Sequence, residues 1–264
     1  MAEADIGAVR LHYQFDGRGQ GPVLVLAHSL GTDLTMWDGV VERLTPRWRI
    51  LRFDARGHGR SSVPPGPCTV ADLAQDLLAL LDTLAIERVH LAGVSLGGMV
   101  GMHLGIHAPQ RLGHLVLINT AARIGTREGW NARIQEALHD GMGSVANGAA
   151  ERWFTPGFRQ ANAPLIARLQ AALAASSAQG YAAACAAIRD MDLTPDLGRI
   201  AAPTLVVAGT HDAVTPPAES RILEQSIPRA RYAELPAAHL SPVELPDALS
   251  RSILAFLAEE LPHG

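Results

Sequence analysis

The sequence contains no lysine: all 22 cationic side chains in its 264 residues are arginines. This absence excludes reactions that need a lysine amine, such as Schiff-base formation, pyridoxal-phosphate chemistry and phosphate binding by a P-loop lysine. The net charge of −4 and the lack of a basic block argue against nucleic-acid binding, which needs clustered cations. An anionic ligand would therefore have to be recognised by arginine or histidine.

Cysteine is nearly absent as well. Cys68 and Cys185 are too few for a disulfide framework, and no CxxC or His/Cys cluster indicates a metal site. The acidic first residues lack the basic start and apolar run of a signal peptide. No apolar stretch reaches the ~18 residues that span a bilayer. We therefore expect no metal, no membrane partner and a cytoplasmic location.

What the sequence does contain is apolar, with 48% hydrophobic and 18% charged residues, and it alternates between strand-like and helix-like segments. This alternation implies βαβ crossovers, and hence a mainly parallel sheet with helices on both faces. Strands are expected at 8–15 (an edge strand), 22–28, 48–54, 88–93, 114–119, 204–208 and 230–235, and helices at 70–84, 96–107, 217–226 and 243–260.

The alternation stops between residues 122 and 198. The composition of this stretch favours helix, glycine and proline residues interrupt it, and it shows no clear strand. Its Ala-rich part, 171–187, is interpreted as helix because alanine is a strong helix former. A helical insertion between two halves of one sheet is the simplest arrangement. We expect a core domain made of 1–121 and 199–264, and a cap made of 122–198.

The strongest local signal is Gly93-Val-Ser-Leu-Gly97, followed by Gly98, between a predicted strand and a predicted helix. This context is typical of a nucleophile elbow, a strained turn that exposes a serine above a sheet. The neighbouring residues must be small because the strand and helix backbones cross there. Ser95 is therefore the candidate nucleophile, and a purely structural turn is the alternative.

A serine nucleophile needs a base, and in this architecture the chain order is serine, acid, histidine. His239 follows strand 230–235 and is the candidate base; His263, next to last in the chain, is the weaker one. Asp212 closes the turn after strand 204–208, at the sheet edge where active sites gather, and would hold the histidine ring. The alternatives are a surface-loop histidine and an aspartate that caps the following helix.

The oxyanion of a serine hydrolase needs backbone donors. The amide of Leu96, directly after the serine, is one candidate. The second donor is expected from the loop after strand 22–28, either from Leu30 or from Ser29.

The elbow, the strand pattern, the turn DARGHGRS at 54–61 and the ordered Ser, Asp and His resemble the α/β-hydrolase family over about residues 8 to 258. The resemblance implies an α/β fold with an eight-stranded, mostly parallel sheet, helices on both faces and a helical cap inserted after the sixth strand. Dehalogenases and epoxide hydrolases of this family carry Asp where this chain has Ser95, which argues against both activities.

Four finer segments resemble the 3-oxoadipate enol-lactonases within this family. They are HSLGTDLTMW at 28–37, NTAARIG at 119–125, ERWFTP at 151–156 and GTHD at 209–212. The resemblance implies hydrolysis of an anionic enol-lactone in the β-ketoadipate pathway of aromatic degradation, with no cofactor. A general carboxylesterase, a C–C hydrolase with the same triad and a ligand receptor without turnover remain alternatives.

An anionic lactone also implies a cation in the pocket. Arg123, directly after strand 114–119, is the first candidate, with Arg133 and Arg152 behind it and surface solvation as the alternative for each. Trp130 and Trp153 are candidates for the pocket wall, with packing between cap and core as the alternative.

Overall fold

The computed structural model describes residues 2–17 and 21–260. An eight-stranded sheet runs through the molecule in the order β1-β2-β4-β3-β5-β6-β7-β8. Its two pairings at the β1 end are antiparallel and the other five are parallel, which confirms the mostly parallel sheet. The strands are β1 (Ala2–Asp5), β2 (Arg10–Asp16), β3 (Val23–Ala27), β4 (Arg49–Phe53), β5 (Val89–Val94), β6 (Leu112–Ile118), β7 (Thr204–Gly209) and β8 (Ala230–Leu235).

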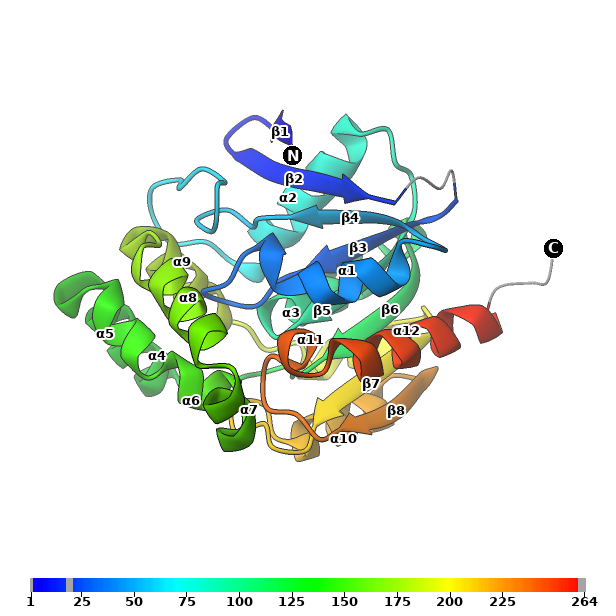
Figure 1. The fold of residues 1–264 in the computed structure, drawn as a ribbon. Coiled ribbons are helices and arrows are strands. Elements are labelled where there is room, and N and C mark those ends of the chain that lie inside the picture. Colours follow the sequence, from blue (N-terminus) through cyan, green and yellow to red (C-terminus); the bar gives the residue numbers. More distant parts are fainter. Residues whose placement is uncertain (1, 18–20, 261–264) are drawn as a thin grey trace.

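Helices cover both faces of this sheet (Figure 1). They are α1 (Asp38–Leu44), α2 (Val70–Thr83), α3 (Leu96–His107), α10 (Pro217–Ser226), α11 (Ser241–Glu244) and α12 (Pro246–Glu260), with 3₁₀ turns at Leu34–Trp37 and Pro109–Arg111. Gly101 of α3 lies against Leu115 of β6. Phe256 of α12 packs on His114, which directly precedes Leu115 in the same strand. Successive strand residues point to opposite faces, so α3 and α12 lie on opposite sides of the sheet.

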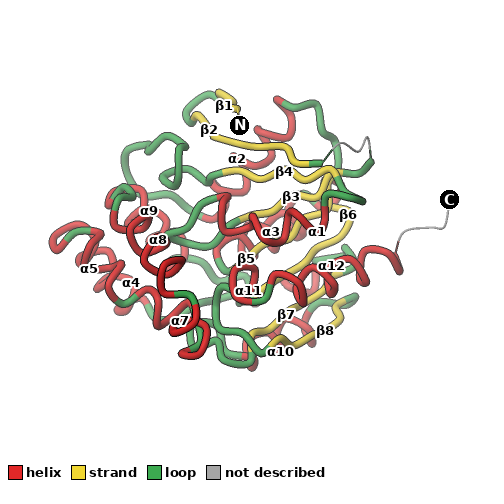
Figure 2. The backbone as a smooth tube through the Cα atoms, viewed as in Figure 1, coloured by secondary structure: helices red, strands yellow, loops and turns green. Residues whose placement is uncertain are grey.

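Between β6 and β7 the chain is helical, and we call residues 122–198 the cap. Figure 2 shows this cap as a group of red helices to one side of the yellow sheet. It contains α4 (Arg127–Gln135), a π-helical turn (Glu136–Asp140), α5 (Met142–Asn147), α6 (Ala149–Trp153), α7 (Pro156–Ala161), α8 (Ala163–Ala174), α9 (Ala178–Arg189) and a 3₁₀ turn (Thr194–Arg199).

One expectation about local structure is wrong. The strand predicted at 8–15 is β2, which lies inside the sheet because β1 pairs with it and forms the edge. The sequence of β1, AEAD, has low strand propensity, so its pairing with β2 decides its conformation. The Ala-rich run 171–187 is helical as predicted, but it is divided between α8 and α9, which meet at 93°. Ser177 caps α9 by accepting the Gly180 amide at 3.1 Å.

None of the described helices is by itself both long enough and apolar enough to cross a membrane. The bent pair α8 and α9 meets both requirements when the two helices are taken together, on length and composition only.

A buried pair of imidazoles lies on the sheet face beneath α12. His90 Nδ1 and His114 Nδ1 share a hydrogen bond of 2.8 Å, and each residue is 8% exposed. Such a bond needs one protonated and one unprotonated nitrogen. Burial, followed by the influence of His114 and Arg88, lowers the pKa of His90 to about 4. His90 is therefore neutral in the folded protein at neutral pH.

We expect the free energy of unfolding to decrease as the pH falls from 6.5 to about 4. In this window the unfolded chain binds a proton at His90 and the folded chain does not, so stability present above pH 6.5 is lost on acidification. His90→Leu should reduce this loss by on the order of 1–3 kcal/mol. Denaturant unfolding of both proteins at the two ends of the window checks this, and parallel pH profiles would contradict it.

Candidate active site

Ser95 stands at a sharp turn between β5 and α3. Its φ of 53° and ψ of −113° lie outside the regions that residues with a Cβ usually adopt. A Cβ on Gly93 would overlap the backbone of Gly97, and a Cβ on Gly97 would overlap the carbonyl of Ala27. Glycine at both positions therefore lets the helix cross the strands this closely, and the crossing holds Ser95 in its strained conformation.

Asp212 and His239 meet beyond the carboxyl ends of β7 and β8. His239 Nδ1 donates to Asp212 Oδ2 at 2.8 Å, and both residues are buried. The amides of Val214 and Thr215 donate to Asp212 Oδ1 at 2.8 and 3.0 Å, and the Thr215 hydroxyl donates to Oδ2 at 2.7 Å. Burial acts to raise the pKa of Asp212, but His239 and the hydrogen bonds outweigh it and lower that pKa. An ionised Asp212 favours the tautomer in which His239 Nε2 is free to take a proton.

Asn119, directly after β6, was missed by sequence reasoning. Its side-chain amide donates to Asp212 Oδ2 at 2.9 Å and to the Ala238 carbonyl at 3.2 Å, and its oxygen accepts from the Ser241 hydroxyl at 2.7 Å. Asn119 is fully buried and has a φ of 47°. It ties Asp212 to the loop that carries His239. The available signal was a polar residue at the carboxyl end of a buried strand.

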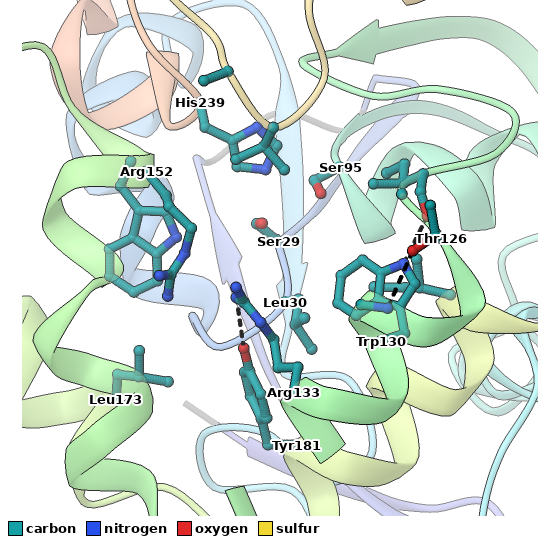
Figure 3. A pocket seen from close by; sticks show the side chains of 17 residues that line it. Ser29, Leu30, Ser95, Thr126, Trp130, Arg133, Arg152, Leu173, Tyr181 and His239 are labelled. Atoms are coloured by element: carbon teal, nitrogen blue, oxygen red, sulfur yellow. Dashed lines mark hydrogen bonds between the residues drawn. The ribbon is translucent and has the colours of Figure 1, made fainter. Parts of the chain in front are cut away.

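Ser95 and His239 border a pocket of about 310 Å³ between the sheet and the cap. Figure 3 shows both side chains turned toward this cavity, with Trp130 on another side of it. Trp130 and Trp153, the predicted wall residues, both belong to the lining. The complete lining is Ser29, Leu30, Ser95, Ile124, Gly125, Thr126, Gly129, Trp130, Arg133, Arg152, Trp153, Leu173, Tyr181, Ile188, Ala213, Val214 and His239.

The three backbone amides predicted for the oxyanion differ in whether they already donate a hydrogen bond. The Ser29 amide already donates to the Met36 thioether at 3.4 Å. The Leu30 amide donates to no other group among the described residues. Leu96 is the first residue of α3, so its amide has no partner within the helix. Leu30 and Leu96 are therefore the amides available to an oxyanion, and Ser29 is the weaker candidate.

Two arginines of the cap reach the pocket, and neither is Arg123, the first candidate from the sequence. Arg133 of α4 and Arg152 of α6 line the pocket, and Figure 3 shows both guanidinium groups turned into it. Arg123 is exposed and does not belong to the lining. Its neighbours Ala122 and Ile124 are both buried, which turns the intervening side chain toward solvent. The expectation that Arg123 binds a carboxylate in this pocket is therefore wrong.

Among the residues that the structure describes, the two pocket arginines have only neutral hydrogen-bond partners. Arg133 Nη1 donates to the Tyr181 hydroxyl at 3.5 Å, and Arg152 Nη2 donates to the Val145 carbonyl at 3.2 Å. No carboxylate of the described residues lies within 4.0 Å of either guanidinium group. Burial, followed by repulsion from Arg133, lowers the pKa of Arg152. Two guanidinium groups that repel each other in a mostly apolar pocket indicate a site for an anion.

Neither cysteine belongs to the pocket lining. Burial raises the pKa of Cys68 to about 11 and that of Cys185 to about 12, so both thiols stay protonated. Within the described ranges, no three His, Cys, Asp or Glu side chains gather in a way that could hold a metal ion. His263, the weaker candidate base, lies outside the described residues.

Comparisons with known proteins extend over both core and cap. A family model described as the alpha/beta hydrolase fold matches residues 22–246. The chain is 39% identical to 3-oxoadipate enol-lactonase 2 of Acinetobacter baylyi, over 94% of this chain and 93% of that protein. The crystal structure of an enol-lactonase from Burkholderia xenovorans LB400 matches with a TM-score of 0.96 and 40% identity, over 97% of this chain and 100% of that chain. RutD of Variovorax paradoxus, whose name describes a carbamate hydrolase, is 32% identical over 96% of this chain and 98% of its own length.

Proposed function

Since the chain belongs to the α/β-hydrolase family, we propose that it is a serine hydrolase that opens 3-oxoadipate enol-lactone to 3-oxoadipate. The observation that carries this proposal is a pocket that combines a serine and a histidine with two arginines lacking carboxylate partners. Such a pocket suits an ester that also bears a carboxylate. The similarity to an enol-lactonase of Acinetobacter baylyi, over 94% of this chain, supports the same substrate.

In the proposed reaction Ser95 Oγ attacks the lactone carbonyl while His239 Nε2 takes the hydroxyl proton. Asp212 stabilises the resulting imidazolium, and the amides of Leu96 and Leu30 donate hydrogen bonds to the tetrahedral oxyanion. Collapse of this intermediate breaks the ring C–O bond. The enol oxygen leaves with the proton from His239, and the enol becomes a ketone. A water molecule deprotonated by His239 then hydrolyses the acyl-enzyme and releases Ser95.

Arg133→Met and Arg152→Met are each expected to lower kcat/KM for the carboxylated lactone. A hydrogen bond to a charged group is worth about 1.5–3 kcal/mol, which corresponds to a loss of roughly 10- to 150-fold. Methionine removes the charge and keeps much of the apolar bulk. Hydrolysis of p-nitrophenyl acetate, which has no carboxylate to recognise, should change little. Steady-state kinetics with both substrates checks the expectation.

Arg123→Met is the matched control, because Arg123 is an exposed arginine of the cap outside the pocket lining. Its kcat/KM for the lactone should stay within about two-fold of wild type, as is usual for surface substitutions. A selective loss in Arg123→Met would return carboxylate recognition to Arg123. If kcat/KM fell equally for both substrates in the pocket variants, the arginines would support the structure of the cap and would not bind the substrate carboxylate.

A carbamate hydrolase is the second candidate, favoured by the similarity to RutD at 32% identity. A small carbamate ester, which is neutral, would meet the same serine and histidine but would leave the two guanidinium groups without an anion. Turnover of such a carbamate that is faster than turnover of the lactone would support this second function.

A further inference from the structure

The loop that carries His239, residues 236–240, is held by the cap as well as by the core. On the core side, Asn119 donates to the Ala238 carbonyl at 3.2 Å. On the cap side, the Leu240 amide donates to the Trp153 carbonyl at 3.0 Å. The two residues that flank His239 are thus fixed by different parts of the molecule. We call residues 236–240 the base loop.

Glu244 of α11 forms a second link between the base loop and the cap. Its Oε2 accepts the Ala238 amide at 2.9 Å. Its Oε1 accepts the Thr155 amide at 3.2 Å and also the Thr155 hydroxyl. Figure 1 shows α7, which begins directly after Thr155, next to α11. One carboxylate therefore joins a cap residue to the residue that precedes His239.

The environment of Glu244 makes these contacts interdependent. The residue is 7% exposed, and no cation of the described residues lies within 4.0 Å of its carboxylate. A buried carboxylate without a cation depends on its hydrogen-bond donors, and the loss of one leaves a desolvated oxygen. The donors come from both the cap and the base loop. A displacement of Thr155 therefore weakens the hold on Ala238.

The cap segment that takes part, residues 152–155, also borders the pocket. Arg152 and Trp153 line it, while the Trp153 carbonyl and Thr155 hold the base loop. We propose that Glu244 is a positioning residue which couples the seating of this cap segment to the orientation of His239. The proposal rests on the serine-hydrolase function above. An anionic substrate that contacts Arg152 helps to seat the segment, and His239 is correctly oriented only when the segment is seated.

Thr155→Val tests the coupling because it removes the hydroxyl that donates to Glu244; the same hydroxyl also caps α7 by accepting the Phe158 amide at 3.4 Å, and the control below accounts for that loss. Loss of a hydrogen bond to a charged group should lower kcat by roughly 10-fold or more, with a smaller change in KM. Thr155→Ser keeps the hydroxyl and should restore kcat. Ser177→Ala is the matched control: like Thr155, Ser177 caps a cap helix through its hydroxyl, but it has no contact with the base loop. Its kcat should stay within about two-fold of wild type.

A second variant and a spectroscopic signal keep the proposal testable if Thr155→Val does not fold. Glu244→Gln places an amide group against one of the donors and should also lower kcat. The proton resonance of His239 Nδ1–H should shift or broaden in Thr155→Val and Glu244→Gln and stay unchanged in Ser177→Ala. Wild-type kcat and an unchanged resonance in the first two variants, or an equal loss of kcat in Ser177→Ala, would overturn the proposal.

The kinetics are measured with both the enol-lactone and p-nitrophenyl acetate. If the wild-type protein hydrolyses the ester and not the lactone, the proposed substrate is wrong. The same comparison of variants on the ester then still reports whether Glu244 orients His239, so the two failures are distinguishable.

Discussion

Ser95→Ala is expected to lower kcat by on the order of 10⁴–10⁶-fold, as is typical when the members of a catalytic triad act as one unit. The substitution removes the only atom that can form the acyl-enzyme in the proposed reaction. Alanine has the same Cβ as serine and keeps the backbone of the elbow, so the unfolding temperature should change little. Steady-state kinetics on the lactone and thermal unfolding of both proteins check this pair of results.

Retention of more than about a tenth of wild-type kcat would refute Ser95 as the nucleophile. The absence of an initial burst of p-nitrophenol in the variant provides an independent test, because the burst reports acyl-enzyme formation. A burst that persists in Ser95→Ala would mean that another residue is acylated.

Asp212→Asn is expected to lower kcat by about 10³- to 10⁴-fold, less than His239→Ala does. Oδ2 accepts from His239, Asn119 and Thr215, and Oδ1 accepts from two backbone amides. The new NH₂ group must therefore face at least two donors, whichever way the asparagine is oriented. If the NH₂ group faces His239, either the ring changes tautomer or its hydrogen bond is lost. If it faces the two backbone amides instead, the hydrogen bond to His239 remains but the carboxylate charge that stabilises the imidazolium is gone.

Unlike Ser95→Ala, Asp212→Asn should also lower the unfolding temperature, since it leaves buried donors without an acceptor. Asp196→Asn is the control, because Asp196 is a half-buried aspartate in the 3₁₀ turn at the end of the cap and does not line the pocket. Its kcat should stay within about two-fold of wild type. If Asp212→Asn kept kcat within ten-fold of wild type while the control behaved as expected, Asp212 would not be the acid of the triad.

The nucleophile elbow and the acid and base positions could be predicted because each depends on local sequence. Gly93 and Gly97 around Ser95 are required by a crossing of two adjacent elements. Asp212 and His239 each follow a strand by a few residues, and neighbouring parallel strands bring their carboxyl ends together. No knowledge of how the cap folds is needed for these inferences.

Which of the three candidate arginines reaches the pocket could not be predicted in this way. Arg123 follows β6 directly, as a pocket residue might be expected to do, but the buried Ala122 and Ile124 on either side of it point it outward. Arg133 and Arg152 reach the pocket because of how α4 and α6 pack over the sheet. That packing depends on contacts between residues far apart in the chain, which helical periodicity does not report.

Neither the edge strand β1 nor the hydrogen bonds of Asn119 to Asp212 and Ala238 were predicted, and the reasons are related. The segment AEAD becomes a strand only through its pairing with β2, since its own propensity is low. Asn119 gains its role from Asp212 and Ala238, which lie 93 and 119 residues further along the chain. In both cases the decisive partner is distant in sequence.

The substrate that we propose for this α/β hydrolase is a carboxylated enol-lactone. The most direct test is to measure kcat/KM of the purified protein for 3-oxoadipate enol-lactone, generated enzymatically from muconolactone, beside p-nitrophenyl acetate. We expect kcat/KM for the lactone to exceed that for the ester by at least about 10-fold, because only the lactone engages Arg133 and Arg152. Equal or faster turnover of the neutral ester, or no opening of the lactone, would contradict this proposal.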